Sequence, residues 1–500
     1  MSERKSVWRR SVERQKFDRL SEGVSADVVV VGAGITGLTS ALLLQRADRH
    51  VVCVEAEEVG AGTTGGTTGK VTSQHGLIYA DLISRHGMET AQSYAEANEL
   101  AVDLVRLLSE ELEIDGVMSA SAYVYSGSSE DMSLLEDEFK AAESLGLPAQ
   151  LADGNWLPFP VAGVLEFTNQ LQIHPIAYLD ALASAFVEEG GTLYENTRVD
   201  GLNEVDGRVT VSAGSGSVTA GHAVIATLLP FIDRGGFFAR TTPSRAYGVA
   251  ALLERPPPEG MYIGISDPVG SFRPWLEGGE TGIIVVGETH DTGHGDATPG
   301  RWGELERWTN ENFDVASFEY RWSAQDYRTV DGIPYVGRSP LTERTWVATG
   351  FAKWGLSNGT AAASMITDEI QGVGNPHAST FNARRIGDAK AVAELVAMNA
   401  HVGKQFIKGR IASLISASID DLSEGDGAVV DHDGERVAAY RDPSGRVHAV
   451  RVECTHLGCY VSWNDAENTW DCPCHGSRFA IDGAIITGPA TEPLEQVSLE

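Results

Sequence analysis

Two short stretches near the end of the chain, each with two cysteines and one histidine, constrain the fold more than any other feature. Residues 454–459 read C-T-H-L-G-C, and residues 472–477 read C-P-C-H-G-S. One cysteine and one histidine from each stretch can bring two thiolates and two imidazoles to one metal centre. A zinc ion accepts such a set, but it does not need Cys459 and Cys474 at matching places in the two stretches. A two-iron cluster, with soft thiolates on one iron and neutral imidazoles on the other, explains the pattern better.

These stretches, here called the first and second cluster loops, resemble those of Rieske [2Fe-2S] proteins from respiratory and photosynthetic cytochrome complexes. The resemblance implies that Ser477 donates a hydrogen bond to a cluster sulfur. The tyrosine expected two residues later is Phe479, so one hydrogen bond is missing and we expect a middling reduction potential. Residues 488–490 (G-P-A) resemble the proline loop that covers the cluster. The resemblance implies four ligands and a disulfide between the loops: Cys454, His456, Cys472 and His475 as ligands, and Cys459 with Cys474 as the disulfide.

A dinucleotide-binding pattern stands near the other end of the chain. The apolar run 27–31 leads into G-A-G-I-T-G at residues 32–37, and an apolar stretch of helical character follows. Such a turn lets a pyrophosphate approach the backbone at the N-terminus of a helix. A second apolar run ends at Glu55, about twenty residues beyond the glycines, where an acidic group bonds a ribose 2'-hydroxyl and disfavours NADP.

FAD is favoured over NAD because the glycine-rich loop 60–70 follows the fingerprint, and its amides can line a flavin diphosphate or ring. Residues 223–227, 331–337 and 350–359 look like a returning strand and a closing segment. Together these motifs, over residues 25–375, resemble the D-amino-acid oxidase (DAO) superfamily of FAD-dependent oxidoreductases, which implies FAD and a small amine or amino-acid substrate. The expected FAD contacts are Gly32, Gly34, Ile35, Thr36, Gly37, Glu55, Ala56, Thr63, Thr64, Thr227, Asp331, Gly332 and Gly355.

The predicted fold is α/β, a Rossmann-like FAD-binding domain with an interleaved α+β substrate domain, followed by an all-β Rieske domain. Short alternating strands, such as residues 427–430, 436–440 and 447–452, fit that last domain. We expect it to dock firmly, because no long flexible tether precedes it. The predicted boundaries are an N-terminal arm at 1–24, FAD-binding parts at about 25–90, 145–240 and 325–375, substrate parts at about 91–144 and 241–324, a helical linker at 376–411 and the Rieske domain at 412–500.

Four residues are candidates for the catalytic face, where the superfamily resemblance places them near the flavin ring: Tyr247, Arg273, Lys353 and Trp354. Arg273 can clamp a substrate carboxylate, although an arginine is more often a surface or ion-pair residue. Trp354 is a pocket wall or a core residue. His75 is either a covalent flavin attachment point or, as we favour, a buried and hydrogen-bonded histidine near the cofactor.

The formal net charge of −32 argues against nucleic acid or an anionic membrane surface as a partner. No apolar run reaches membrane-spanning length. Residues 1–20 are charged and lack an apolar signal core, so we expect an extended arm on a cytoplasmic protein. The remaining cysteine, Cys53, lies on a buried-looking strand and is expected to be inert.

Together the modules predict that a flavin takes two electrons from an amine or amino acid and passes them singly to the cluster. Exposed cluster histidines would then reduce a quinone, a cytochrome or a soluble carrier; the reverse direction is also permitted. Two alternatives are a flavin oxidase that reduces oxygen beside a structural Rieske module, and a redox sensor without turnover.

Overall fold

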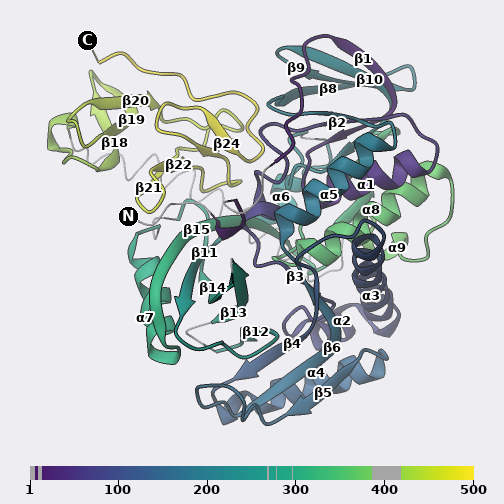
Figure 1. Ribbon diagram of the computed structural model, residues 1–500. Coiled ribbons are helices and arrows are strands. Elements are labelled where there is room, and N and C mark those ends of the chain that lie inside the picture. Colours follow the sequence, from purple (N-terminus) through teal and green to yellow (C-terminus); the bar gives the residue numbers. More distant parts are fainter. Residues whose placement is uncertain are drawn as a thin grey trace.

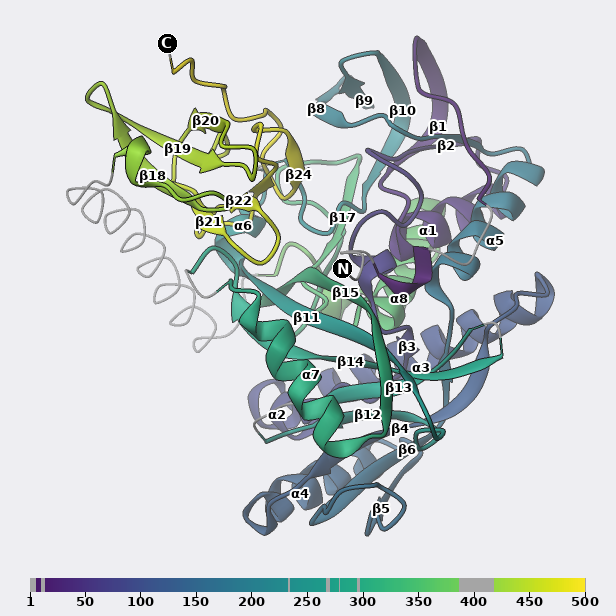
Figure 2. The same cartoon turned by 60° about the vertical axis from the view of Figure 1, so that its left-hand side comes forward.

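The computed structural model describes residues 6–9, 14–232, 234–266, 270–277, 279–294, 297–385 and 418–499 of the 500-residue chain. Figures 1 and 2 show a large domain, residues 6–385, and a C-terminal domain, residues 418–499, packed against it. Residues 386–417 hold most of the predicted helical linker, and that part lies outside the described residues. Among the described helices, none is both long and apolar enough to cross a bilayer.

The first sheet of the large domain has a parallel centre. Its strands run in the order β16-β17-β10-β1-β2-β7, and β9 joins β10 to β8. The valine-rich β1 and β2 are buried and parallel, as expected of strands covered on both faces. The strands are β1 Gly23–Val31, β2 Val51–Val54, β7 Thr192–Tyr194, β8 Val199–Val205, β9 Arg208–Ala213, β10 Gly216–Ile225, β16 Tyr335–Arg338 and β17 Thr345–Thr349; the helices packed with them are α1 Ile35–Arg46, α5 Pro175–Glu188 and α8 Gly355–Gln371.

The second sheet is mostly antiparallel and runs in the order β15-β11-β14-β13-β12-β4-β6-β3, with β5 beside β6. Its strands are β3 Lys70–Val71, β4 Met118–Ser126, β5 Ala149–Ala152, β6 Gly163–Gln172, β11 Thr241–Leu253, β12 Met261–Gly264, β13 Ser271–Glu277, β14 Glu280–Asp291 and β15 Val315–Thr329. The prediction that the FAD-binding part resumes at about residue 145 is therefore wrong, because β5 and β6 pair with the second sheet. Remaining helices of the large domain are α2 Ile78–His86, α3 Met88–Glu111, α4 Met132–Ser144, α6 Phe237–Arg240, α7 Gly300–Asn312, α9 Ala378–Phe381 and the 3-10 turns η1 Val7–Arg9, η2 Thr63–Gly66 and η3 Ser129–Asp131.

The C-terminal domain consists of two small antiparallel sheets, β18-β19-β20 and β21-β22-β23-β24, in agreement with the predicted all-β fold. Helix α6 of the large domain meets the C-terminal domain through Phe238, whose ring contacts those of His456 and His475. The elements are η4 Ile419–Asp421, β18 Gly427–His432, β19 Glu435–Arg441, β20 Val447–Arg451, β21 Ser462–Asn464, β22 Thr469–Asp471, β23 Arg478–Phe479 and β24 Ile485–Thr487.

The described part of the N-terminal arm packs on the glycine-rich loop 60–70. Val7 and Trp8 are buried. The Trp8 indole N–H donates to the Thr67 carbonyl at 2.7 Å, and the Ser6 hydroxyl donates to the Gly65 carbonyl. The arm therefore supports a loop that the sequence assigns to the cofactor, instead of extending freely.

Candidate flavin and cluster sites

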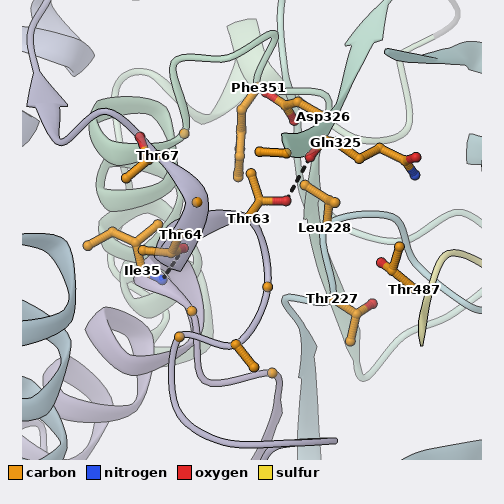
Figure 3. Close-up of a pocket in the computed structure, with 18 of the residues that line it drawn as sticks. Ile35, Thr63, Thr64, Thr67, Thr227, Leu228, Gln325, Asp326, Phe351 and Thr487 are labelled. Atoms are coloured by element: carbon orange, nitrogen blue, oxygen red, sulfur yellow. Dashed lines mark hydrogen bonds between the residues drawn. The ribbon is translucent and has the colours of Figure 1, made fainter. Parts of the chain in front are cut away.

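One cavity, of about 440 Å³, joins the dinucleotide fingerprint, the glycine-rich loop, the closing segment near residue 354 and the C-terminal domain. Figure 3 shows Ile35 and Thr64 on one side of it and Thr227 and Thr487 on the other. Thr63 bridges toward β15, because its hydroxyl donates to the Gln325 carbonyl at 2.7 Å.

At the fingerprint turn, neighbouring backbone segments approach the glycines as closely as the sequence predicts. Gly32 has a φ of 104°, and a Cβ there would lie 2.6 Å from the Ala226 carbonyl oxygen. A Cβ on Gly37 would lie 1.8 Å from the Gly32 carbonyl oxygen, so Gly37 packs α1 against the turn instead of lining the cavity. Gly34 caps α1 without a side-chain hydrogen bond of its own, and the Ile35 amide donates to the Thr64 hydroxyl at 3.2 Å. Gly34, Ile35 and Thr36 line the cavity, so the N-terminus of α1 faces the place expected for a pyrophosphate.

Glu55 lies at the cavity end of β2, where its carboxylate is held in place. One oxygen accepts a hydrogen bond from the Ala33 amide at 2.7 Å, and the other accepts from the Glu57 amide at 3.0 Å. Burial raises its pKa, against the lowering effect of these amides. A fixed carboxyl group beside the N-terminus of α1 fits the ribose and pyrophosphate of FAD.

Most of the expected FAD contacts line the cavity, but Asp331 and Gly332, like Gly37, do not. Asp331 does not line the cavity; it forms an ion pair with Arg385, with Nε to Oδ2 at 2.7 Å. The hydrogen-bonded Arg385 holds the pKa of Asp331 below its usual value although burial raises it. Gly332, its neighbour, is also outside the lining, so the structure does not bring these two residues to the cavity, and their contact with FAD stays a prediction. The predicted residues that do line the cavity are Gly32, Gly34, Ile35, Thr36, Glu55, Ala56, Thr63, Thr64, Thr227 and Gly355.

Arg273 does not lie where a carboxylate clamp requires. Its guanidinium is buried, donates to the carbonyls of Gly69 at 3.1 Å and Ile173 at 3.2 Å, and stacks over the Trp8 ring. Burial lowers its pKa to about 9. Arg273 is not among the cavity-lining residues, and these contacts make it a support of the glycine-rich loop.

The other three catalytic candidates line the cavity. Lys353 has a φ of 76°, its amide donates to Asp326, and its ammonium donates to the Thr289 hydroxyl at 2.6 Å. The Lys353 side chain is exposed, and desolvation by the surrounding protein lowers its pKa, against the opposing effect of Asp326. Tyr247 is buried, with its hydroxyl 3.2 Å from His290 Nε2, and burial raises its pKa to about 12.

His75 confirms the expectation of a buried, hydrogen-bonded histidine. Its Nε2 is 2.8 Å from the Thr72 carbonyl, so that nitrogen carries the proton, and its Nδ1 accepts from the Tyr94 hydroxyl at 2.7 Å. Burial lowers its pKa to about 3. The ring stacks on Trp354, with centroids 4.8 Å apart, and therefore supports that cavity wall from behind.

The cavity also contains titratable residues that were not predicted from the sequence, among them Lys70 and Asp326. The Lys70 ammonium donates to the Tyr262 carbonyl and to the Ser271 hydroxyl, both at 2.6 Å. Burial, with a smaller effect of Arg273, lowers its pKa to about 7. Burial raises the pKa of Asp326 to about 6. The only hint in the sequence is that Lys70 is the single charged residue of the glycine-rich loop 60–70.

The four predicted cluster ligands converge in the C-terminal domain. Cys454 and Cys472 are free and buried, and Nδ1 of His456 lies 3.2 Å from Nδ1 of His475. A disulfide joins the two cluster loops through Cys459 and Cys474. The disulfide removes those two sulfurs as ligands, so two thiols and two imidazoles remain, which fits a [2Fe-2S] cluster with mixed ligands.

The cluster loops face the large domain. The Phe238 ring in α6 meets the rings of His456 and His475 edge to face, with centroids 5.1 and 4.9 Å apart. His475 is 5% exposed, and Leu457 beside His456 is 48% exposed. The expectation that both histidines are exposed is therefore wrong for His475, because the domain docks through its cluster end.

Polar contacts fix this docking. The Gln325 amide donates to the Gly476 carbonyl at 2.8 Å, and the Tyr327 hydroxyl donates to the His475 carbonyl at 3.1 Å. The C-terminal domain also supplies part of the cavity wall, at Arg478, Ile486, Thr487, Gly488, Ala490 and Thr491. The two predicted cofactor sites therefore share one wall.

Comparisons with known proteins agree with both sites. The family model for FAD dependent oxidoreductases (DAO) matches residues 27–369, and the Rieske [2Fe-2S] domain model matches residues 413–498. A putative Rieske 2Fe-2S iron-sulfur protein, YhfW of Bacillus subtilis (strain 168), is 36% identical over 99% of this chain and 98% of its own length. Gamma-glutamylputrescine oxidoreductase of Escherichia coli (strain K12) is 28% identical over 42% of this chain and 50% of its own.

Among solved structures, glycine oxidase from Geobacillus kaustophilus superposes with a TM-score of 0.60 at 19% identity, over 73% of this chain and all of that one. That likeness shows the fold of the large domain. The fingerprint, the paired cluster loops and the two family matches agree along almost the whole sequence. The chain belongs to the DAO family of FAD-dependent oxidoreductases and carries a Rieske [2Fe-2S] domain at its C-terminal end.

Proposed function

We propose that this oxidoreductase oxidises a small amine or amino acid and passes the electrons, through its flavin, to its own Rieske cluster and on to an external acceptor. FAD, when bound, accepts two electrons from a substrate and can release them one at a time, as a one-electron cluster requires. The observation that carries the proposal is the shared wall: residues 486–488 and 490–491 of the cluster domain line the same cavity as the FAD fingerprint.

Relatives and the cavity together support the substrate class. The comparisons include a gamma-glutamylputrescine oxidoreductase and a glycine oxidase, which by name act on an amine derivative and an amino acid. Lys70 and Lys353 bring two ammonium groups to the cavity, and such groups suit a substrate carboxylate. Asp326, whose pKa burial raises to about 6, is placed to exchange a proton near neutral pH.

The electron acceptor is proposed to be a quinone, a cytochrome or a soluble carrier, and to meet the cluster at the His456 side. His475 is covered by the large domain, whereas the neighbour of His456, Leu457, is 48% exposed. A location in the cytoplasm stays a prediction from the sequence.

An anaerobic titration with a panel of amines and amino acids tests the proposal. Flavin bleaching is followed by absorbance, and the reduced cluster by low-temperature EPR. We expect one substrate to bleach the flavin and a Rieske signal to grow afterwards. A flavin that bleaches while the cluster stays oxidised, with peroxide formed stoichiometrically in air, would support the oxidase instead. A flavin that no metabolite reduces would support a sensor.

A further inference from the structure

Strand β15 connects the two cofactor sites. Its residues alternate between faces, as strand residues do. Gln325 and Tyr327 project toward the second cluster loop, while the carboxylate of Asp326, between them, accepts a hydrogen bond from the Lys353 amide in the closing segment. The Gln325 carbonyl also accepts the hydroxyl proton of Thr63 in the glycine-rich loop. Residues 325–327 of this strand therefore contact both the glycine-rich loop and the second cluster loop.

A chain of buried hydrogen-bond donors runs from β15 to the second cluster loop. The Gln325 side-chain amide donates to the Tyr327 hydroxyl at 3.0 Å and to the Gly476 carbonyl at 2.8 Å. The Tyr327 hydroxyl donates to the carbonyl of His475, a predicted ligand, at 3.1 Å. Gln325 is 3% and Tyr327 1% exposed, so water does not weaken these interactions.

The backbone of the second cluster loop allows this close contact with β15 at Gly476. Gly476 has a φ of 73°, and a Cβ there would lie 2.9 Å from the Tyr327 hydroxyl oxygen and 2.6 Å from Pro243. The loop backbone can approach β15 this closely only because it carries no side chain at that point.

We propose that Gln325 and Tyr327 of the large domain form the outer hydrogen-bond shell of the cluster and raise its reduction potential in the docked state. Donors aimed at a ligand loop stabilise the reduced, more negative cluster. Tyr327 is a positioning residue in this scheme, because it acts through the His475 backbone. The inference concerns the cluster and does not require the flavin to be its electron donor.

The test is a redox titration of the cluster in the intact holoprotein, followed by EPR, in three variants. Tyr327→Phe keeps the ring and removes the donated proton. Gln325→Leu removes the side-chain amide that donates to both the Tyr327 hydroxyl and the Gly476 carbonyl. Tyr178→Phe is the matched control, because its hydroxyl is buried in the core of the large domain and has no hydrogen-bond partner among the described residues.

We expect Tyr327→Phe to lower the reduction equilibrium constant of the cluster about tenfold, which is about 59 mV for one electron, and to shift its g-values. Gln325→Leu should act in the same direction, and Tyr178→Phe should change neither quantity. The iron and flavin contents show whether each variant holds both cofactors. The radius of gyration from small-angle X-ray scattering shows whether the C-terminal domain stays docked on the large domain.

Three results would overturn the proposal. The first is an unchanged potential in loaded Tyr327→Phe and Gln325→Leu. The second is an equal fall in Tyr178→Phe. The third is loss of the cluster or of docking in both β15 variants, which would make the contact structural only.

Discussion

The carboxylate of Glu467 in the C-terminal domain lies 2.5 Å from the guanidinium of Arg245 in β11, and the Arg245 side chain is 2% exposed. Arg478 meets the same carboxylate at 2.9 Å and also pairs with Asp471. Two cations and two anions are thus buried together at the seam between the domains. Removing the Glu467 carboxylate takes the ion-pair partner from the buried Arg245, whereas Arg478 keeps Asp471. A buried charge that loses its partner is far more costly than the loss of a surface pair.

Glu467→Gln should therefore destabilise the docked protein by about 3–5 kcal/mol. Chemical denaturation of the holoprotein, followed by flavin release, measures the change. Glu495→Gln is the control, because Glu495 is 75% exposed and pairs with Arg451 at the surface, where such pairs contribute about 0–1 kcal/mol. Equal stability of the two variants would show that the Glu467 network does not hold the domains together.

The same network predicts an acid limit to stability. Burial alone would raise the pKa of Glu467, but Arg245 and Arg478 lower it to about 2. An unfolded glutamate has a pKa of about 4.3. Because the folded pKa is the lower one, Glu467 contributes its stability above about pH 4.3 and loses it as the pH falls toward 2. Acid unfolding should therefore be less steep between these values in Glu467→Gln than in the wild type.

Gly37→Ala should abolish FAD binding, because a Cβ would lie 1.8 Å from the Gly32 carbonyl oxygen and must displace the fingerprint turn. Flavin content of the purified protein is the readout. Gly303→Ala in α7 is the matched control: no atom of the described part of the chain lies within 4 Å of the added Cβ, and alanine favours a helix by up to about 1 kcal/mol. A flavin-replete Gly37→Ala protein would contradict the packing role of Gly37.

Cys459→Ser should leave a cluster that assembles poorly or bleaches quickly, because the disulfide to Cys474 joins the two ligand loops. Iron content and the decay of visible absorbance in air measure this. Cys53→Ala is the comparison, since Cys53 is free and buried on β2 in the large domain. A fully stable cluster in Cys459→Ser would show that packing alone holds the loops.

Local motifs were predictable from the sequence, and long-range contacts were not. The glycines of the fingerprint and the cysteines of the cluster loops need particular neighbours within a few residues, so their spacing reveals them. Whether Arg273 points into the cavity depends on the Trp8 ring and the Ile173 carbonyl, which are distant in sequence. The burial of His475 under Phe238 likewise depends on how two domains dock.

Lys70 gives a prediction on the pH dependence of carboxylate binding. Its ammonium lines the cavity and has a pKa of about 7, lowered chiefly by burial. Below pH 7 the group is a cation that attracts a carboxylate, and above pH 7 it is neutral and the attraction is lost. Acetate, the smallest carboxylate probe, should therefore perturb the flavin spectrum with an affinity that falls as the pH rises from 6 to 9.

Variants at Lys70 separate charge from shape. Lys70→Met should bind acetate weakly at every pH, and Lys70→Arg, which stays charged, should bind it without the fall near pH 7. Lys140→Met is the control, because Lys140 is 65% exposed on the protein surface and should leave the wild-type profile intact. If Lys70→Met keeps that profile, another group in the cavity titrates, and Asp326, with a pKa of about 6, is the next to replace.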